Sequence, residues 1–418
     1  MPAKGKLRLD VPLVLTALFL SLYGISMVYS AGQTDIPIAK YIANAYKQQA
    51  VWFALALGVA YFISRASVRM IEWMTVPLYA VILILLAATL VVGGGAGTAA
   101  SSKSWIGVGP VRIQPAELAK IIVVLMLART LAAKREPPKS LLELWKPALV
   151  VGVPWLLIMA QPDLGTGLVF IGILFGMLFW AGTPWPLLVF VASPAVSLVL
   201  AFSKQWWGAW FLLLVALVLW YRPYLYEGIF VVVSNVIMGV LAPLLWERLE
   251  PYQQKRLLVF LDPTSDPRQS GYHVIQSKVA IGSGGLFGKG FTHGSQKRLA
   301  FLPEQHTDFI FSVVGEEMGF IGVTIALALF LVLFIRIIRI GERASDPYAS
   351  LVAFGLLSSW FVHVLVNVGM TLSLMPITGI PLPFFSYGGS FMLASWLAIG
   401  ILVRIANEGR GRTTHLAI

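Results

Sequence analysis

The chain has 418 residues, of which 58% are hydrophobic and 12% are charged. About a quarter of the residues of a soluble domain are charged, so a water-soluble fold of this length could not bury so much apolar surface. The absence of cysteine excludes a disulfide framework and any metal site with cysteine ligands. These properties predict a membrane protein.

Apolar segments long enough to cross a bilayer recur along the chain. A helix needs about 20 apolar residues to cross roughly 30 Å of hydrocarbon, and no strand-like alternation indicates a barrel. The expected spans are 11–31, 49–64, 70–92, 113–132, 147–161, 165–181, 186–202, 207–221, 227–246, 309–336, 349–370 and 388–406. The first span follows a basic segment and lacks a small-residue cleavage site, which favours a retained helix over a signal peptide. The sequence thus predicts an all-α polytopic membrane protein with about 10–12 transmembrane helices.

Basic residues are distributed unevenly between the segments that join these spans. If the N-terminus is cytoplasmic, the inner segments are rich in Lys and Arg and the short outer loops hold few. The positive-inside rule therefore predicts that both termini are cytoplasmic. Because the inner segments explain most of the net charge of +12, this charge does not indicate binding to nucleic acid.

One long polar segment, 247–306, interrupts the apolar pattern. In this topology it is a large extracytoplasmic loop of a single membrane domain that covers residues 1–418. It holds eight basic residues against five acids, and an outer loop gains nothing in topology from positive charge. We therefore expect it to meet an anion, such as a lipid headgroup or a lipid-linked phosphate. Its run "GSGGLFGKG" is not a P-loop, because Gly290 follows Lys289 where Ser or Thr is needed.

Two charged residues stand at the start of the fourth span, in "VRIQPAELAK". Glu117 and Lys120 are three residues apart and share a helical face. They could form a structural ion pair between helices, or they could line a polar cavity near the outer surface together with Lys103 and Arg112. The residues alone leave both alternatives open.

Three further polar stretches are unusual for a membrane protein. Asp163 in "AQPDLGTG" occupies a tight turn, where it could simply cap the next helix. The stretch "HTDFIFSVVGEEMG" places Asp308, Ser312 and Glu316 on one stripe of a helix, although interhelical hydrogen bonding would also explain them. The proline- and glycine-rich "MPITGIPLPFFSYGGS" has irregular backbone, which survives at membrane depth only if it is buried in protein or lines a cavity. The five histidines show no metalloprotease spacing, so a metal role has little support.

Five motifs, in the same order and covering nearly the whole chain, resemble the SEDS family, the bacterial shape, elongation, division and sporulation proteins. They are "KSWIGVGPVRIQPAELAK", "QPDLGTG", "FLDPTSDPRQSGYHVIQSKVAIGSGGLFGKG", "LAFLPEQHTDFIFSVVGEEMGF" and "MPITGIPLPFFSYGGS". Within the family, the chain is most similar to the rod-elongation branch, RodA, rather than to the division branch, FtsW.

The resemblance implies a peptidoglycan glycosyltransferase that polymerises lipid II at the outer face of the bacterial cytoplasmic membrane during cell elongation. It implies a class B penicillin-binding protein as partner, with MreC and MreD in the same elongation complex. The family's essential aspartate corresponds to Asp262 in "FLDP". The other important polar positions, which would bind substrate, correspond to Lys103, Arg112, Glu117, Lys120, Asp163, Lys289, His306 and Asp308.

The chemistry of glycosyl transfer agrees with this role for Asp262. A carboxylate within hydrogen-bond reach of the GlcNAc 4-hydroxyl of lipid II could accept its proton as the general base. The donor would be the lipid-linked glycan, whose undecaprenyl diphosphate leaves with inversion, and Lys and Arg would stabilise the charge of the diphosphate. A divalent cation could assist, although nothing in the sequence requires a cofactor. An aspartate before proline is also a common turn residue, and Asp266 in a second Asp-Pro pair is the rival candidate.

The chain departs from the family in its number of spans. Members usually have ten spans, seven of which precede the large loop. Nine spans are expected before the loop in this chain, so 183–246 is predicted to contain an extra helix pair. A second function remains open, because a polar intramembrane cavity with a basic outer mouth would also suit a lipid II flippase or another transporter of lipid-linked sugars. Transporters tend to show repeated halves, which the sequence does not reveal.

Overall fold

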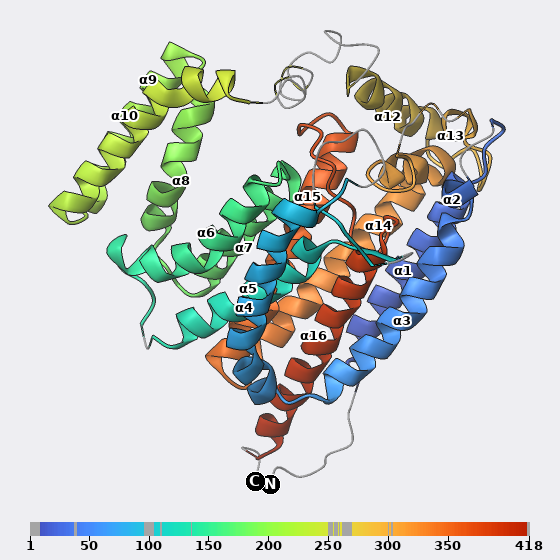
Figure 1. Cartoon of the computed structure of the whole chain (residues 1–418), viewed down its shortest axis with the longest axis horizontal. Helices are drawn as coiled ribbons and strands as arrows, with labels where there is room; N and C mark the ends of the chain where they lie inside the picture. Colours follow the sequence, from blue (N-terminus) through green and yellow to red (C-terminus); the bar gives the residue numbers. More distant parts are fainter. Residues whose placement is uncertain are drawn as a thin grey trace.

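The computed structural model describes residues 9–36, 40–95, 104–108, 111–134, 136–249, 254, 258, 260, 270–299, 301 and 304–415. These residues are mostly helical, and the long helices lie side by side as a bundle (Figure 1). Two short strands, β1 (Ile106–Val108) and β2 (Val111–Ile113), form an antiparallel hairpin with Gly107 opposite Arg112. The predicted fold class is confirmed.

The helices coincide with the expected spans. Their bounds are α1 Val11–Ala31, α2 Lys40–Ala43, α3 Ala45–Arg65, α4 Val68–Val92, α5 Pro115–Ala132, η1 Leu142–Leu144, α6 Trp145–Met159, α7 Leu164–Trp180, α8 Trp185–Leu200, α9 Lys204–Tyr221, α10 Leu225–Glu247, α12 Ser270–Gly284, α13 Ser295–Arg298, α14 Ile310–Glu342, α15 Pro347–Thr371 and α16 Gly389–His415. Each of the twelve expected spans corresponds to one of these helices. In the described part of the chain, seven helical segments are long and apolar enough to cross a membrane, and α7 and α8 are apolar but shorter.

The centre of the bundle is formed by α15 and α16. The first packs against α5, α7 and α14, and the second against α3. Trp396 of α16 is buried between the rings of Phe53 and Phe384, and its indole N–H donates to the hydroxyl of Ser21 at 3.1 Å. The polar atom of this large side chain is therefore satisfied inside the apolar core.

Helix α14 is interrupted at Gly319, whose φ of 63° and ψ of −162° are not helical. Four backbone hydrogen bonds of 2.9 to 3.2 Å join segment 285–290 to residues 316–321 and replace helical bonds that the break removes. The approach is so close that a Cβ atom on Gly288 would lie 2.0 Å from the carbonyl oxygen of Glu317. The glycine run of the predicted loop is therefore a clamp on the broken helix.

Different segments of the chain lie at the two ends of the bundle. Arg336 near the end of α14 binds Asp10, the N-cap of α1, through two hydrogen bonds of 2.7 and 2.5 Å. Gly409 of α16 lies against the backbone of Arg343 at the same end. Helices α12 and α13, which belong to the predicted loop 247–306, lie at the opposite end (Figure 1).

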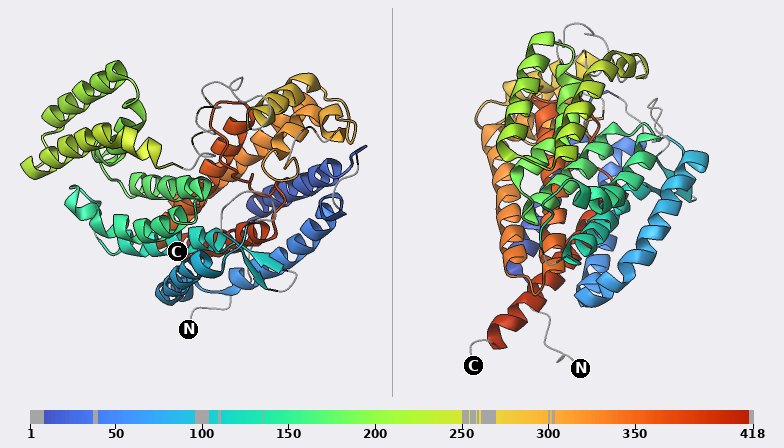
Figure 2. Two further views of the ribbon diagram at one scale, coloured as in Figure 1. Left: turned by 45° about the horizontal axis from the view of Figure 1, so that its top comes forward. Right: turned by 90° about the vertical axis from the view of Figure 1, so that its left-hand side faces the viewer.

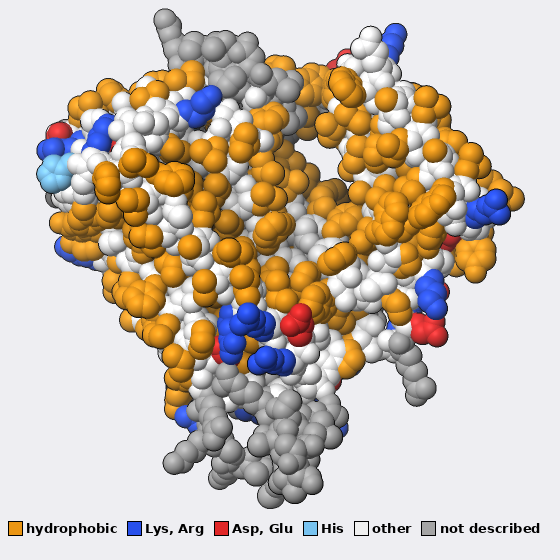
Figure 3. Space-filling model, turned by 180° about the vertical axis from the view of Figure 1, so that it is seen from behind, with side chains coloured by type: hydrophobic (Ala, Val, Ile, Leu, Met, Phe, Trp, Pro, Cys, Tyr) orange, Lys and Arg blue, Asp and Glu red, His pale blue; other side chains and the backbone are white. Residues whose placement is uncertain are grey.

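Helices α8, α9 and α10 form a layer that stands to one side of the bundle (Figures 1 and 2). They share a small apolar core of Leu187, Phe190, Leu214 and Val231. The amide of Asn235 links α10 to Ser193 and Ser197 of α8 through hydrogen bonds of 2.7 and 2.6 Å. The outer faces of the layer are rich in exposed apolar side chains, and apolar side chains also cover most of the middle of the reverse face of the molecule (Figure 3). Such faces suit contact with lipid. That the layer includes an extra helix pair remains a prediction.

Candidate active site

A buried ion pair lies at the start of α5. Pro115 occupies the first turn, where a missing N–H costs nothing, and Glu117 and Lys120 follow on the same face. Nζ of Lys120 lies 2.7 Å from Oε2 of Glu117, and these residues are only 4% and 3% exposed. A cavity of about 20 Å³ adjoins the pair and is lined also by Trp360 and Ser395, which is room for one water molecule. The structure thus shows a buried ion pair beside a small cavity whose other walls are mostly apolar, such as Ile121 and Leu356.

His363 of α15 completes this group, and the sequence analysis did not select it. Its Nε2 lies 2.8 Å from Nζ of Lys120, and its Nδ1 lies 2.9 Å from the carbonyl oxygen of Pro381. The imidazole stacks on the ring of Phe391 at 4.8 Å, and the ammonium of Lys120 lies 5.0 Å from the same ring. An ionisable residue inside an expected span is a functional candidate, and this signal alone would have identified His363. We call Glu117, Lys120 and His363 the α5–α15 polar cluster.

The proline-rich segment 376–387 packs between α15 and the residues that precede α14. The amide of Asn367 donates to the carbonyls of Ile380 and Asp308 at 2.7 and 2.9 Å. The hydroxyl of Ser386 donates to the carbonyl of Thr307 at 2.6 Å. This segment is largely buried, as the sequence predicts for irregular backbone at membrane depth, and side chains of its neighbours satisfy its backbone groups.

Asp163 caps α7 and also contacts the beginning of α5. Its carboxylate accepts hydrogen bonds from the backbone N–H and the hydroxyl of Thr166 at 3.0 and 2.9 Å. The amide of Gln114, the residue before α5, donates to Oδ2 of Asp163 at 3.3 Å. A Cβ atom on Gly165 would lie 2.6 Å from the carbonyl oxygen of Thr378, so the start of α7 packs directly on the proline-rich segment. Capping therefore places Asp163 beside two of the other motifs.

His306 and Asp308 also contact the proline-rich segment. The carbonyl of His306 accepts a hydrogen bond from the backbone N–H of Tyr387 at 2.9 Å, and the two rings are 5.6 Å apart. Burial lowers the pKa of His306 to about 4, so its imidazole is neutral at pH 7. Oδ2 of Asp308 lies 3.3 Å from the position that a Cβ atom on Gly379 would take. Segments 306–308 and 376–387 thus pack directly against each other.

Lys289 belongs to a second group of charges, next to the break in α14. Its Nζ lies 2.9 Å from Oε1 of the buried Glu316 and 2.7 Å from the hydroxyl of Ser295. Beside it, Nζ of Lys297 lies 3.0 Å from Oε1 of Glu317, and both of these side chains are completely buried. The first pair attaches the connection between α12 and α13 to α14, and the second attaches α13 itself to α14.

The remaining predicted site residues lie at or beyond the edge of the described chain. Arg112 is exposed on strand β2, and its carbonyl accepts a hydrogen bond from the hydroxyl of Ser390 at 3.4 Å. Lys103 and Asp262 lie outside the described residues. Among the residues that are described, no three histidine or acidic side chains come together in a group that could hold a metal ion.

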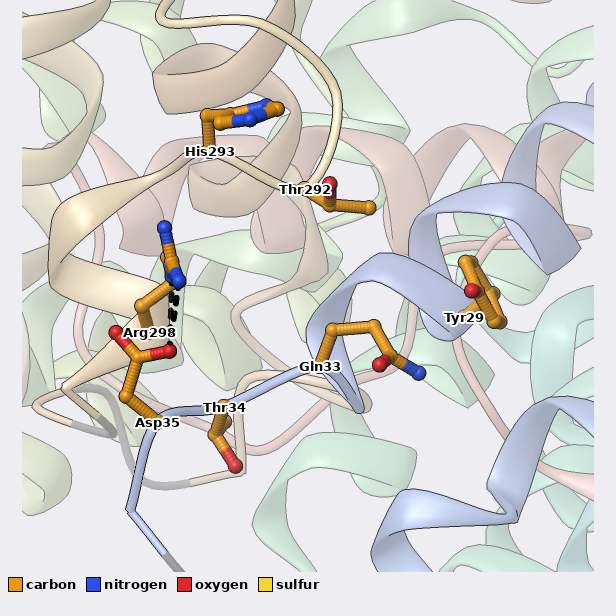
Figure 4. Close-up of a pocket in the computed structure, with 7 residues that line it drawn as sticks. All are labelled: Tyr29, Gln33, Thr34, Asp35, Thr292, His293 and Arg298. Carbon is orange, nitrogen blue, oxygen red and sulfur yellow. Dashed lines mark hydrogen bonds and ion pairs between the residues drawn. The ribbon is translucent and has the colours of Figure 1, made fainter.

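A polar cleft of about 270 Å³ lies between the end of α1 and the connection from α12 to α13 (Figure 4). At this cleft, two side-chain nitrogen atoms of Arg298 donate hydrogen bonds to Oδ1 of Asp35, at 2.8 and 3.1 Å. Its other lining residues are Tyr29, Gln33, Thr34, Thr292 and His293. The sequence analysis did not select any of these residues as part of the site.

Known proteins resemble this chain over almost its whole length. The family model of the FtsW, RodA and SpoVE proteins, described as "cell cycle protein", matches residues 11–214 and 207–411. The peptidoglycan glycosyltransferase RodA of Treponema pallidum is 36% identical, over 97% of this chain and 99% of that protein. The peptidoglycan glycosyltransferase MrdB of Escherichia coli K12 is 37% identical, over 96% of this chain and 94% of that protein. Stage V sporulation protein E of Bacillus subtilis is 35% identical, over 96% and 98%.

Solved structures give the same result. One is a structure of a peptidoglycan synthase complex that shows the structural coordination of polymerization and crosslinking. Its matching chain has a TM-score of 0.72 and is 28% identical, and the match covers 96% of this chain and 98% of that one. The crystal structure of the rod shape determining protein RodA of Thermus thermophilus has a TM-score of 0.62 and 27% identity, over 96% and 97%. The chain therefore belongs to the FtsW, RodA and SpoVE family, the SEDS proteins that the five motifs indicate.

Proposed function

We propose that this protein is a RodA-type peptidoglycan glycosyltransferase that polymerises lipid II into glycan strands. The observation that carries the proposal is the likeness to two peptidoglycan glycosyltransferases, RodA and MrdB, at 36% and 37% identity over nearly the full length of each chain. The arrangement of the described motifs supports it. The α5–α15 polar cluster, the cap of α7 and segment 306–308 all contact the proline-rich segment or the start of α5, so residues far apart in sequence form one polar region within an apolar bundle.

In the proposed reaction, Asp262 takes the proton from the GlcNAc 4-hydroxyl of lipid II. The hydroxyl oxygen forms a bond to the anomeric carbon of the lipid-linked glycan, and the bond from that carbon to the diphosphate breaks with inversion. The leaving undecaprenyl diphosphate carries the negative charge, which Lys103 and Arg112 are suited to stabilise because both belong to the segment that precedes α5. The other proposed substrate-binding residues are Glu117, Lys120, Asp163, Lys289, His306 and Asp308.

We further propose that the reaction takes place on the extracytoplasmic side. The protein is a multi-pass membrane protein of a bacterial family, and its two ends carry different segments. The end that holds Asp10 and Arg336 also holds the terminal parts of α14 and α16, where Arg339, Arg343 and Arg404 add positive charge. This charge supports a cytoplasmic assignment for that end, which would place α12 and α13 outside.

A class B penicillin-binding protein is the partner that we propose. The matching chain of the peptidoglycan synthase complex comes from an assembly that coordinates polymerization with crosslinking. Crosslinking is the chemistry of a transpeptidase, so the likeness to that chain supports a surface on this protein for such a partner. MreC and MreD are proposed as further members of the complex on the strength of the resemblance to the elongation branch.

The decisive experiment supplies the purified protein and its partner transpeptidase with labelled lipid II and separates the products by length. The wild-type protein should form polymer, and Asp262→Asn should form none while still reaching the membrane in normal amounts. Asp266→Asn is the matched control and should remain active, because it changes the second Asp-Pro pair of the same segment. Polymer from Asp262→Asn would remove this residue as the base. Transfer of lipid II across vesicle membranes without any polymer would favour a flippase.

A further inference from the structure

The two nitrogen atoms of His363 contact groups of different kinds. Nδ1 lies 2.9 Å from the carbonyl oxygen of Pro381, which can only accept a hydrogen bond. Nδ1 must therefore carry the proton and donate it. Nε2 lies 2.8 Å from the ammonium of Lys120, which can only donate. The neighbours of the ring thus determine a neutral imidazole whose proton is on Nδ1.

The charges of the α5–α15 polar cluster agree with this assignment. With a neutral ring, Glu117 and Lys120 cancel, and the cluster has no net charge. A second proton on the ring would add a cation to a group in which all three residues are less than 5% exposed, without any further carboxylate among its contacts in the described chain. Such a buried unpaired charge is very unfavourable. Nε2 is therefore available as an acceptor for Lys120.

His363 also connects the ion pair to a distant part of the chain. Pro381 belongs to the proline-rich segment, and Asn367, one helical turn after His363 on α15, holds the neighbouring carbonyl of Ile380 at 2.7 Å. Asn367 thus shares with His363 the task of holding this segment, but its amide has no contact with Lys120 among its hydrogen bonds. Of these two residues, only His363 contacts the ammonium group of Lys120.

We infer that His363 is a positioning residue for Lys120, which orients the ammonium toward Glu117 and couples the ion pair on α5 to the proline-rich segment 376–387. The inference rests on the proposed glycosyltransferase function, in which Lys120 belongs to the substrate-binding region. His363 itself does not touch the reacting atoms in this scheme. It replaces water as the second hydrogen-bond partner of an ammonium that is almost completely buried.

The test compares His363→Gln with His363→Leu in the lipid II polymerisation assay. A glutamine side chain has both an N–H donor and a carbonyl acceptor, so it can contact Pro381 and Lys120, whereas leucine can contact neither. His363→Leu should lower the rate of polymerisation about tenfold or more, because a hydrogen bond to a charged group is lost, and His363→Gln should restore most of it. Equal rates for the two variants would overturn the inference.

A double-mutant cycle separates positioning from a general structural effect. When Lys120→Met is already present, His363→Leu should cost clearly less activity and thermal stability than it costs in the wild-type protein, since only the contact with Pro381 is then left to lose. Asn367→Leu is the matched control, and its effects should add to those of Lys120→Met. If His363→Leu is as additive as Asn367→Leu, His363 only supports the proline-rich segment and the inference fails.

Nitrogen-15 NMR of histidine-labelled protein in bilayers tests the tautomer without any activity measurement. The signals of His363, identified by their loss in His363→Gln, should show a neutral ring protonated at Nδ1. A ring protonated at Nε2, or at both nitrogens at pH 7, would contradict the inference. If the wild-type protein forms no polymer at all, the proposed function fails, but this measurement and the cycle in thermal stability still decide the relationship between His363 and Lys120.

Discussion

Oε2 of Glu117 forms an ion pair with the ammonium of Lys120 at 2.7 Å, and within the described part of the chain it has no further hydrogen-bond partner. Both side chains belong to one helix and both are buried, so each charge depends on the other. Removing one member of a buried pair leaves an uncompensated charge, which costs about 3–5 kcal/mol, whereas replacing both members is often nearly neutral.

We therefore predict that Lys120→Met destabilises the protein by about 3 kcal/mol or more, and that the double variant Glu117→Gln/Lys120→Met regains most of the lost stability. Thermal unfolding in detergent measures the stability of each variant. Polymerisation of lipid II should remain impaired in the double variant, because it regains stability but still lacks the two charged side chains of the proposed substrate-binding region. An active double variant would show that the pair is purely structural.

The break in α14 gives a second prediction. Gly319 has a positive φ, and a Cβ atom on it would lie 2.3 Å from the backbone nitrogen of Gly288. Gly319→Ala should therefore lower the free energy of unfolding by about 3 kcal/mol, through backbone strain and loss of the clamp formed by 285–290.

Gly282→Ala in α12 is the control for this substitution. A Cβ atom there meets nothing within 4 Å, so alanine should be neutral or stabilise the helix by up to about 1 kcal/mol. Gly319→Ala should lower the unfolding temperature, whereas Gly282→Ala should leave it unchanged or raise it slightly. Similar shifts would show that the close approach at Gly319 does not determine stability.

The sequence predicted those parts of the structure that depend on neighbouring residues. Apolar runs of helical length predicted a helix at each of the twelve expected spans, and seven helical segments in the described chain are long and apolar enough to cross a membrane. The i,i+3 spacing predicted that Glu117 and Lys120 share a face. The capping role of Asp163 was likewise one of the alternatives that its turn allowed. Each of these features depends on residues that are close to one another along the chain, which is why the sequence pattern could predict it.

Contacts between distant segments could not be predicted in this way. His363 reaches Lys120 across 243 positions, and nothing near either residue in sequence signals the partner. The contact between Lys289 and Glu316 likewise joins residues 27 positions apart, and no local pattern signals it. The role of "GSGGLFGKG" was also missed, because a clamp on a helix is visible only when the helix is seen to be interrupted.

Two neighbouring basic residues of α13 should differ sharply in their contribution to stability. Lys297 and Glu317 are completely buried and 3.0 Å apart, whereas the side chains of Arg298 and Asp35 are 43% and 54% exposed. Lys297→Met should therefore cost about 3–5 kcal/mol, while Arg298→Met should cost at most about 1 kcal/mol, since water and salt screen an exposed pair.

Thermal unfolding at low and high salt checks this prediction. The small effect of Arg298→Met should shrink further as salt is added, and the large effect of Lys297→Met should persist because its partner is shielded from solvent. Equal losses of stability in the two variants would contradict the assignment of Lys297 as the anchor between α13 and α14.

His306 should make the stability of the protein depend on pH. Burial lowers its pKa from an ordinary value of 6.5 to about 4, so between these values the unfolded chain binds more protons than the folded protein. The contribution of the neutral His306 to the free energy of unfolding is therefore fully present above about pH 6.5 and is lost as the pH falls toward 4. At pH 5 the free energy of unfolding should be lower by roughly 2 kcal/mol. Unfolding temperatures of the wild-type protein and of His306→Gln at pH 7 and pH 5 measure this loss, with the exposed His293→Gln as control. The difference between the two pH values should be smaller in His306→Gln and unchanged in His293→Gln; the same difference in all three proteins would mean that other groups cause the acid sensitivity.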